Sequence, residues 1–293
     1  MYKYIINPIT KEKININSTF GKTILKNYIM QLSGGKPNTS SQNIVCFLTV
    51  RPNKTFLDFC DSLHSHYNVF VCVDDNSYKV PKTQHCNIIQ INNNTSKNAG
   101  FHNILGYYNK KFKNKSISRD KALYYFYHNL PKNKYVWFIE EDVFIPQINT
   151  LINIDNKYPQ TDLLCKQNLI YNNIQDTIKP KWYHWQHVFN DSNLNFPYGR
   201  SMICAIRCSY NLIQLIGKHA EKYGKLYVDE SIFNTIALQN NLSIITPKEL
   251  QNILFRKKVK GRNGDWDISE IKPTHLYHPF KDTYKQQHFR TLL

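Results

Sequence analysis

The 293-residue sequence contains no apolar run that approaches the roughly 20 residues needed to cross a bilayer. Its beginning, residues 1–8, also lacks the apolar stretch of a secretory signal peptide. Because both features are missing, we expect a soluble protein with no membrane span that works in the cytoplasm.

The sequence has no C-x-x-C pair among its seven cysteines, which lie at positions 46, 60, 72, 86, 165, 204 and 208. Several of them fall inside apolar runs, such as residues 44–48. We therefore expect buried, reduced thiols, and neither a disulfide framework nor a zinc site.

Acidic residues are scarce: 21 Asp and Glu stand against 38 Lys and Arg, which gives a formal net charge of +17. A field of this sign attracts anionic partners such as nucleoside diphosphates, nucleic acid or anionic lipid. The alternative explanation is a compositional bias, since Asn, Lys, Ile and Tyr are used heavily throughout. The charge predicts the sign of a partner and not its identity.

Residues 1–36 are predicted to form a small N-terminal module, a hairpin plus a helix, followed by turn-forming residues over 33–41. The segment Asn7-Pro8-Ile9-Thr10, with an isoleucine-containing turn and a helical stretch after it, resembles a short module that recurs in proteins of large DNA viruses. The alternative is a hairpin and helix that pack on the main domain. A viral origin would place the protein in the host cytoplasm or the virion.

Short apolar runs alternate with helical stretches over residues 43–293, which favours one α/β domain with a mainly parallel central sheet flanked by helices. We place Ser118 as the N-cap of a helix. Strands are predicted at 44–50, 69–73, 87–91, 135–139, 162–165, 201–206 and 242–245, and helices at 55–66, from 118, at 209–223 and at 229–239.

Carboxylates follow two of these strands, where the ligands of an open α/β sheet bind. Asp74 and Asp75 follow the second strand and could accept hydrogen bonds from ribose or a base; the alternative is a solvated turn. Glu140, Glu141 and Asp142 follow a fully apolar strand and precede another apolar run. Alternation puts Glu140 and Asp142 on one face and Glu141 on the other.

Burying this acidic segment, residues 140–142, is costly unless a cation compensates the like charges. Mn²⁺ or Mg²⁺ would do so and would hold the phosphates of a nucleoside diphosphate. The alternative is an exposed strand end.

Residues 43–280 resemble the glycosyltransferase-A superfamily, whose Asp-x-Asp-like motif corresponds to the acidic segment. The resemblance implies a Rossmann-like fold, a UDP-sugar donor, a glycan or glycoprotein acceptor, and hexosyl- or N-acetylhexosaminyltransferase activity. It also implies that Asp142, and secondly Glu140, binds the metal, although Glu at the first motif position departs from the family pattern. The nucleotide-sugar contacts that it implies are Thr49, Arg51, Asp74, Asp75, Arg119, Lys121, Glu140 and Glu141.

An inverting transferase also needs a general base for the acceptor hydroxyl. Residues 226–233 are similar to the helix start that carries this base in branching N-acetylglucosaminyltransferases and xylosyltransferases. The similarity implies that Glu230 is the base, with Asp229 as its substitute. The alternative is that both are first-turn acids that favour the helix dipole. A retaining mechanism would require another role for Glu230.

The last landmark of the superfamily is a C-terminal group beside the diphosphate. In metal-dependent members a histidine completes the metal shell, which implies His278 or His275 here. In metal-independent members basic residues replace the ion, and Arg256, Lys257 or Lys258 would serve.

Acceptor recognition is predicted at two aromatic and glycine-containing segments, because aromatic rings stack on sugars and glycine permits close approach. The alternative is that both tryptophans belong to the core. The residues proposed for acceptor binding are Trp182, Trp185, Gly199 and Arg200.

Three other functions compete with a transferase. A nucleic-acid-binding protein would fit the charge but not an acidic segment among apolar residues. A nucleotidyltransferase or nuclease would need a Gly-rich phosphate loop or a second carboxylate pair, and neither is evident. A non-catalytic glycosyltransferase-like fold would explain the imperfect motif. We favour the transferase.

Overall fold

The computed structural model describes residues 3–6, 13–18, 43–103, 116–178, 182, 184–191, 193–255 and 266–293. The chain forms two compact units, Met1–Gln42 and Asn43–Leu293. In the first unit, β1 (Tyr4–Ile6) and β2 (Lys13–Asn15) pair as an antiparallel hairpin. The hairpin was expected, whereas the helix, the linker and the Asn-Pro-Ile-Thr segment predicted beside it lie outside the described residues.

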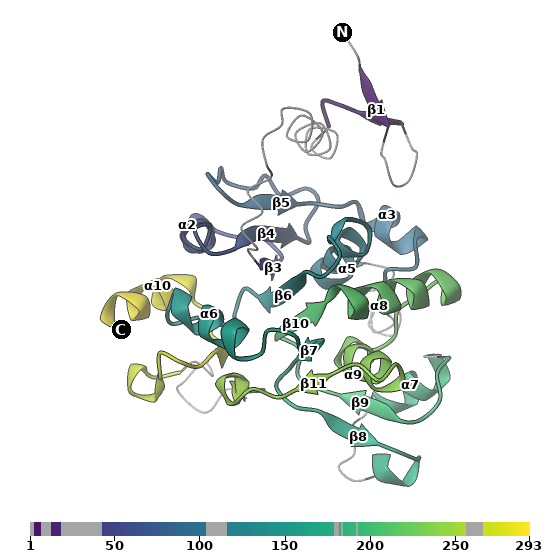
Figure 1. Cartoon of the computed structure of the whole chain (residues 1–293). Helices are drawn as coiled ribbons and strands as arrows, with labels where there is room; N and C mark the ends of the chain where they lie inside the picture. The colour runs from purple at the N-terminus through teal and green to yellow at the C-terminus, as the bar shows by residue number, and fades with distance from the viewer. Residues whose placement is uncertain are drawn as a thin grey trace. The chain divides into compact units, whose positions relative to one another are not determined.

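The second unit is built on a seven-stranded sheet of order β11-β7-β10-β6-β3-β4-β5 (Figure 1). Neighbours are parallel except that β10 runs antiparallel to β6 and β7. The prediction of an α/β unit with a mostly parallel central sheet is therefore confirmed. The strands are β3 (Ile44–Thr49), β4 (Asn68–Val73), β5 (Asn87–Ile89), β6 (Tyr135–Glu140), β7 (Leu163–Leu164), β10 (Ala205–Ser209) and β11 (Ile244–Ile245).

Helices cover both faces of this sheet (Figure 1). They are α2 (Lys54–Ser62), α3 (Asn93–Asn98), α5 (Ser118–Asn129), α6 (Ile148–Lys157), α7 (Trp185–Asp191), α8 (Tyr210–Tyr223), α9 (Asp229–Gln239) and α10 (Thr283–Leu292). Two-stranded sheets are formed by β8 (Leu169–Tyr171) with β9 (Tyr198–Arg200) and by β12 (Asn252–Ile253) with β13 (Tyr277–His278). Short 3-10 turns occur at Gln175–Thr177, Lys248–Leu250 and Ile268–Glu270.

Alternating side chains of the central strands build two cores, one on each face. Cys46 of β3 packs toward α5, α8 and α9, while Phe47 faces α2 and α6. Phe47 meets Phe56 and Phe59 edge-on, with ring centroids 5.5 and 6.1 Å apart. Because β3, β4 and β6 are covered on both sides, almost all of their residues are apolar.

Several predicted boundaries were wrong; the helix expected at 55–66, for example, ends at Ser62. The strand expected at 201–206 is β10, which starts at Ala205, after a connection that crosses beside the end of β6. Ser118 is the first helical residue of α5 and not its N-cap. The backbone N–H of Ile117 donates to Asp120 Oδ2 at 2.9 Å, so a carboxylate three residues along satisfies the helix start.

All seven cysteines are free thiols, six of them buried and Cys86 partly so, as expected. Within the described ranges, no helix combines the length and the apolar character needed to pass through a bilayer.

Candidate active site

The parallel strands β3, β4 and β6 end at one edge of the sheet, and this edge holds the acidic segment. Leu48 pairs with Glu140 and Thr49 with Val73, so residues just beyond these positions are neighbours. Antiparallel β10 begins where β6 ends, and the N–H of Glu140 donates to the carbonyl of Cys204 at 2.8 Å. The topology therefore gathers polar groups from four strands at one place.

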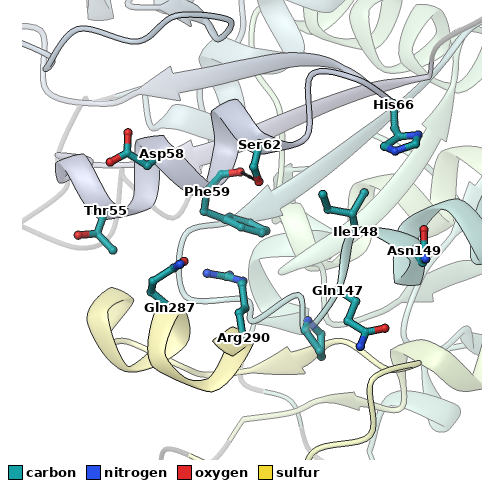
Figure 2. Close-up of a pocket in the computed structure, with 11 residues that line it drawn as sticks. Thr55, Asp58, Phe59, Ser62, His66, Gln147, Ile148, Asn149, Gln287 and Arg290 are labelled. Carbon is teal, nitrogen blue, oxygen red and sulfur yellow. Dashed lines mark hydrogen bonds between the residues drawn. The ribbon is translucent and has the colours of Figure 1, made fainter. Parts of the chain in front are cut away.

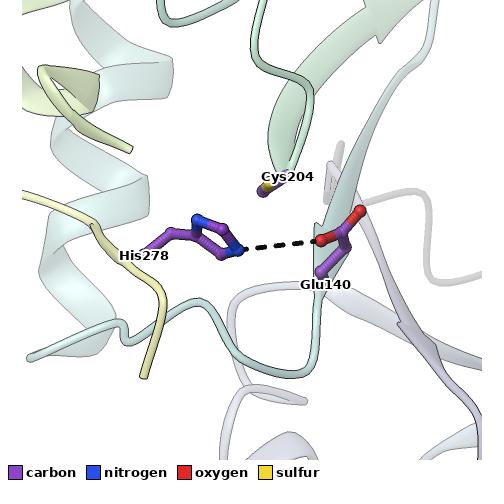
Figure 3. A group of neighbouring side chains, drawn as sticks. All are labelled: Glu140, Cys204 and His278. Carbon is purple, nitrogen blue, oxygen red and sulfur yellow. Dashed lines mark ion pairs between the residues drawn. The ribbon is translucent and has the colours of Figure 1, made fainter. Parts of the chain in front are cut away.

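The C-terminal strand β13 brings His278 to the acidic segment (Figure 3). His278 Nδ1 lies 2.8 Å from the carbonyl oxygen of Leu254, so Nδ1 carries a proton and donates it to this oxygen. Nε2 then faces the carboxylates, 3.4 Å from Asp142 Oδ1 and 4.0 Å from Glu140 Oε2. The histidine is 8% exposed, so its orientation is set by packing.

The backbone holds β13 against the acidic segment. The N–H of Phe280 donates to the carbonyl of Asp142 at 2.7 Å, and Phe144 and Tyr277 exchange backbone hydrogen bonds of 2.8 and 3.1 Å. His278 is therefore placed by a fixed main-chain contact and not by the freedom of a long loop.

The charges of Asp142 and His278 stabilise each other. Burial alone would raise the pKa of Asp142, but the hydrogen bond and charge of His278, with help from Lys281, lower it. Burial alone would lower the pKa of His278, but Asp142 raises it. A cation bound here would take the place of the imidazolium charge.

The donor set at this edge fits a divalent ion. Ligand atoms of Glu140, Cys204 and His278 lie within 4.8 Å of one another, and Asp142 adds another oxygen beside His278. Carboxylate oxygens and an imidazole nitrogen suit Mn²⁺, and the oxygens alone suit Mg²⁺. Burial keeps the pKa of the Cys204 thiol well above its usual range, so the sulfur is a neutral neighbour.

Residues 141–142 form a turn after β6, so the strand alternation predicted for residues 140–142 does not extend through them, and Glu141 has contacts of its own. Thr49 Oγ1 donates to its Oε2, and Gln286 Nε2 of α10 donates to its backbone carbonyl at 3.0 Å. Burial raises the pKa of Glu141. The contact joins the loop after β3 to the acidic segment.

Arg119, at the start of α5, links the acidic segment to helix α9. Its Nη2 lies 2.5 Å from Glu140 Oε1, its Nη1 lies 2.8 Å from Asp229 Oδ2, and Nη2 also donates to the carbonyl of Ile203 at 3.2 Å. Burial alone would lower the pKa of Arg119, but the two carboxylates raise it. At 4% exposure Arg119 positions the acids and offers little surface to a nucleotide.

Asp74 and Asp75 occupy the neighbouring part of the edge. Lys121 is fully buried, and its Nζ lies 2.5 Å from the backbone oxygen of Asp74 and 3.1 Å from Oδ1. Asp75 accepts from Ser77 and from Arg51 at 2.6 Å, and these bonds lower its pKa to about 2. Asp75 is thus ionised at the rim, where a ribose could reach it.

The first turn of α9 carries Asp229 and Glu230, and among the described residues only Asp229 of these two forms an ion pair. Burial, followed by the charge of Asp229, raises the pKa of Glu230 to about 7. A carboxylate with this pKa exchanges a proton near neutral pH, which is the property required of a general base.

The four residues predicted for acceptor binding fall into two groups. Trp182 stacks with Arg200, whose guanidinium carbon is 4.7 Å from the ring centroid. Trp185 is 4% exposed and packs on Tyr171 in the core. Gly199 lies against α9, where an added Cβ would come within 2.5 Å of a side chain. The structure therefore leaves Trp182 and Arg200 as the surface pair, while Trp185 and Gly199 serve packing.

Other C-terminal residues were predicted to lie beside the metal or the diphosphate. His275 contacts Thr274 and not the acidic segment. Arg256, Lys257 and Lys258 lie outside the described residues. Sequence reasoning missed Cys204, because it sits in an apolar run with no motif to mark it.

No protein-family model matches the chain, and no curated protein matches it either.

Proposed function

We propose that the chain is a metal-dependent glycosyltransferase of the glycosyltransferase-A type that moves a sugar from a UDP-sugar to a glycan or glycoprotein acceptor with inversion. The observation that carries the proposal is the convergence of Glu140, Asp142 and His278 Nε2 at the strand edge, tied through Arg119 to the helix that carries Glu230. This arrangement supplies a diphosphate site and a base together.

The diphosphate side rests on the donor set of the acidic segment. Asp142, Glu140 and His278 would hold Mn²⁺ or Mg²⁺, which supplies positive charge against the diphosphate of the donor. Asp75 and Arg51 stand at the rim as partners for the nucleoside. Arg119 pairs with Glu140 and orients it.

The transfer step needs one proton acceptor. The acceptor hydroxyl oxygen forms a bond to the anomeric carbon while the bond from that carbon to the phosphate oxygen breaks, and the nucleoside diphosphate leaves with the bonding electrons. Glu230 takes the hydroxyl proton and ends as a neutral acid, which its pKa of about 7 permits. Trp182 and Arg200 are proposed to hold the acceptor sugar.

Nucleotide binding tests the proposal. We would titrate UDP, GDP and CMP by calorimetry, with and without Mn²⁺, into wild type, Asp142→Asn and the matched control Asp176→Asn in a 3-10 turn of the β8–β9 connection. We expect one nucleotide to bind only with the ion, and to lose binding in Asp142→Asn alone. Binding of nucleic acid without binding of any nucleotide would replace the proposal with the nucleic-acid-binding alternative.

A further inference from the structure

A cavity of about 830 Å³ lies between α2, α10 and the start of α6 (Figure 2). None of the proposed metal or base residues lines it. Its size falls in the range of small-molecule sites, about 300–1,000 Å³. The cavity is therefore a second candidate binding place, separate from the acidic segment.

Arg290 of α10 is a partly buried cation in this cavity and has no carboxylate partner among the described residues. Its guanidinium lies 3.4 Å from the ring centroid of Phe59, its Nε donates to the carbonyl of Ile145 at 3.0 Å, and its Nη2 donates to Gln286 Oε1 at 2.9 Å. Both acceptors are neutral, and no carboxylate of the described residues forms an ion pair with it.

The pKa of Arg290 reflects the cost of placing its charge in this partly buried position. Burial lowers the pKa of Arg290 to about 9, and only the nearby Cys60 opposes the shift. A guanidinium has five N–H donors, and the two bonds above use two of them. Donors and charge are both left for an anion.

The N-terminus of α6 faces the same cavity through Gln147, Ile148 and Asn149. The N-cap residue Gln147 makes no side-chain cap bond, and the first turn contains no acidic residue. The first backbone N–H groups of a helix lack helical partners, and the helix dipole adds positive potential there. Two independent features thus present positive charge to one cavity.

Asp58 is the carboxylate that lines the cavity with Arg290. It is exposed and forms an ion pair with Lys54. The charge of Asp58 is thus compensated by Lys54 outside the lining, whereas the charge of Arg290 has no carboxylate partner among the described residues.

We propose that this cavity binds a small organic anion, whose carboxylate or phosphate group sits between Arg290 and the N-terminus of α6. The guanidinium is held flat against Phe59, which fixes the fork that recognises planar or tetrahedral oxyanions. The site is independent of the proposed transferase activity and of the metal.

Calorimetry with inorganic phosphate and with acetate, in metal-free buffer at matched ionic strength, tests the site. Wild type is expected to bind at least one anion, and preference for phosphate or for acetate tells which group the ligand carries. Arg290→Met keeps the length and removes the charge, so affinity should fall about tenfold or more. Lys222→Met, which removes one positive charge from an exposed position outside the cavity lining, should bind as wild type does.

Two further variants separate a lost site from a lost fold. Arg290→Lys retains the charge but loses the fork, so it should bind more tightly than Arg290→Met and more weakly than wild type. Ile148→Pro removes one N–H at the first helical residue, and Gln147 already has the extended backbone that must precede proline, so the helix should form while affinity falls. Equal binding by wild type and Arg290→Met, or no binding of either anion to wild type, would overturn the proposal.

Discussion

Replacement of Arg119 by Met is the change whose effect can be worked out most fully from the structure. The Arg119 side chain is 5% exposed, and its partners Glu140 and Asp229 are 32% and 17% exposed. Methionine fills much of the same volume but leaves two carboxylates without their shared cation. Breaking a buried ion pair in this way costs about 3–5 kcal/mol, and partial exposure of the acids favours the lower end.

The loss of stability predicted for Arg119→Met should depend on pH. The loss comes from two carboxylates left without their cation, so it is expected at neutral pH and should shrink in acid, where an ordinary carboxyl group takes up its proton at about pH 4. Urea unfolding should therefore show Arg119→Met less stable than wild type by about 3 kcal/mol at neutral pH, and by much less near pH 4.

The control is Arg51→Met, because Arg51 also pairs with an aspartate but is 64% exposed. Its effect should stay within about 0.5 kcal/mol at both pH values. A loss below about 1 kcal/mol for Arg119→Met, or a loss independent of pH, would refute the idea that Arg119 compensates two ionised acids.

Three other changes have defined outcomes. Because Glu230 must be ionised to act as base, kcat/KM of wild type should rise with pH through about 7. Glu230→Gln should lower the rate by about 100-fold or more and should abolish this pH dependence. Replacing His278 by Gln should weaken Mn²⁺ binding by about 10-fold or more in a calorimetric titration, while the same change at His275 should not. Gly199→Ala should lower the unfolding free energy by about 1–3 kcal/mol, because the new methyl group meets Asn234 Cβ at 2.5 Å; unchanged denaturant stability would contradict the packing.

The fold was predictable because its signals are local. Apolar runs of five or six residues with helices between them predict buried parallel strands, and β3, β4 and β6 are found within one or two residues of the expected positions. The reversed direction of β10 was not predictable, because a short apolar strand reads the same in either direction. Its start at Ala205 depends on where the preceding connection crosses β6, which is a tertiary property.

The candidate site was predictable in part for a similar reason. An uninterrupted run of acids between apolar residues is visible in the sequence, but the turn that follows β6 at residues 141–142 was not predicted. The choice between His275 and His278 could not be made from the sequence, because it depends on the pairing of β13 with β12 and on the Leu254 carbonyl. Nor does the sequence reveal that Arg119 is buried between two acids.

Release of UDP from UDP-sugars tests the central proposal most directly. We would incubate a panel of UDP-sugars with wild type, Asp142→Asn and Asp176→Asn, each with Mn²⁺ and with a chelator. We expect one donor to be hydrolysed slowly by wild type and Asp176→Asn in Mn²⁺, with a loss of about 100-fold or more in Asp142→Asn or on chelation. UDP release that ignores both the ion and the Asp142 change, or its absence with every donor, would contradict a metal-dependent transferase site at the acidic segment.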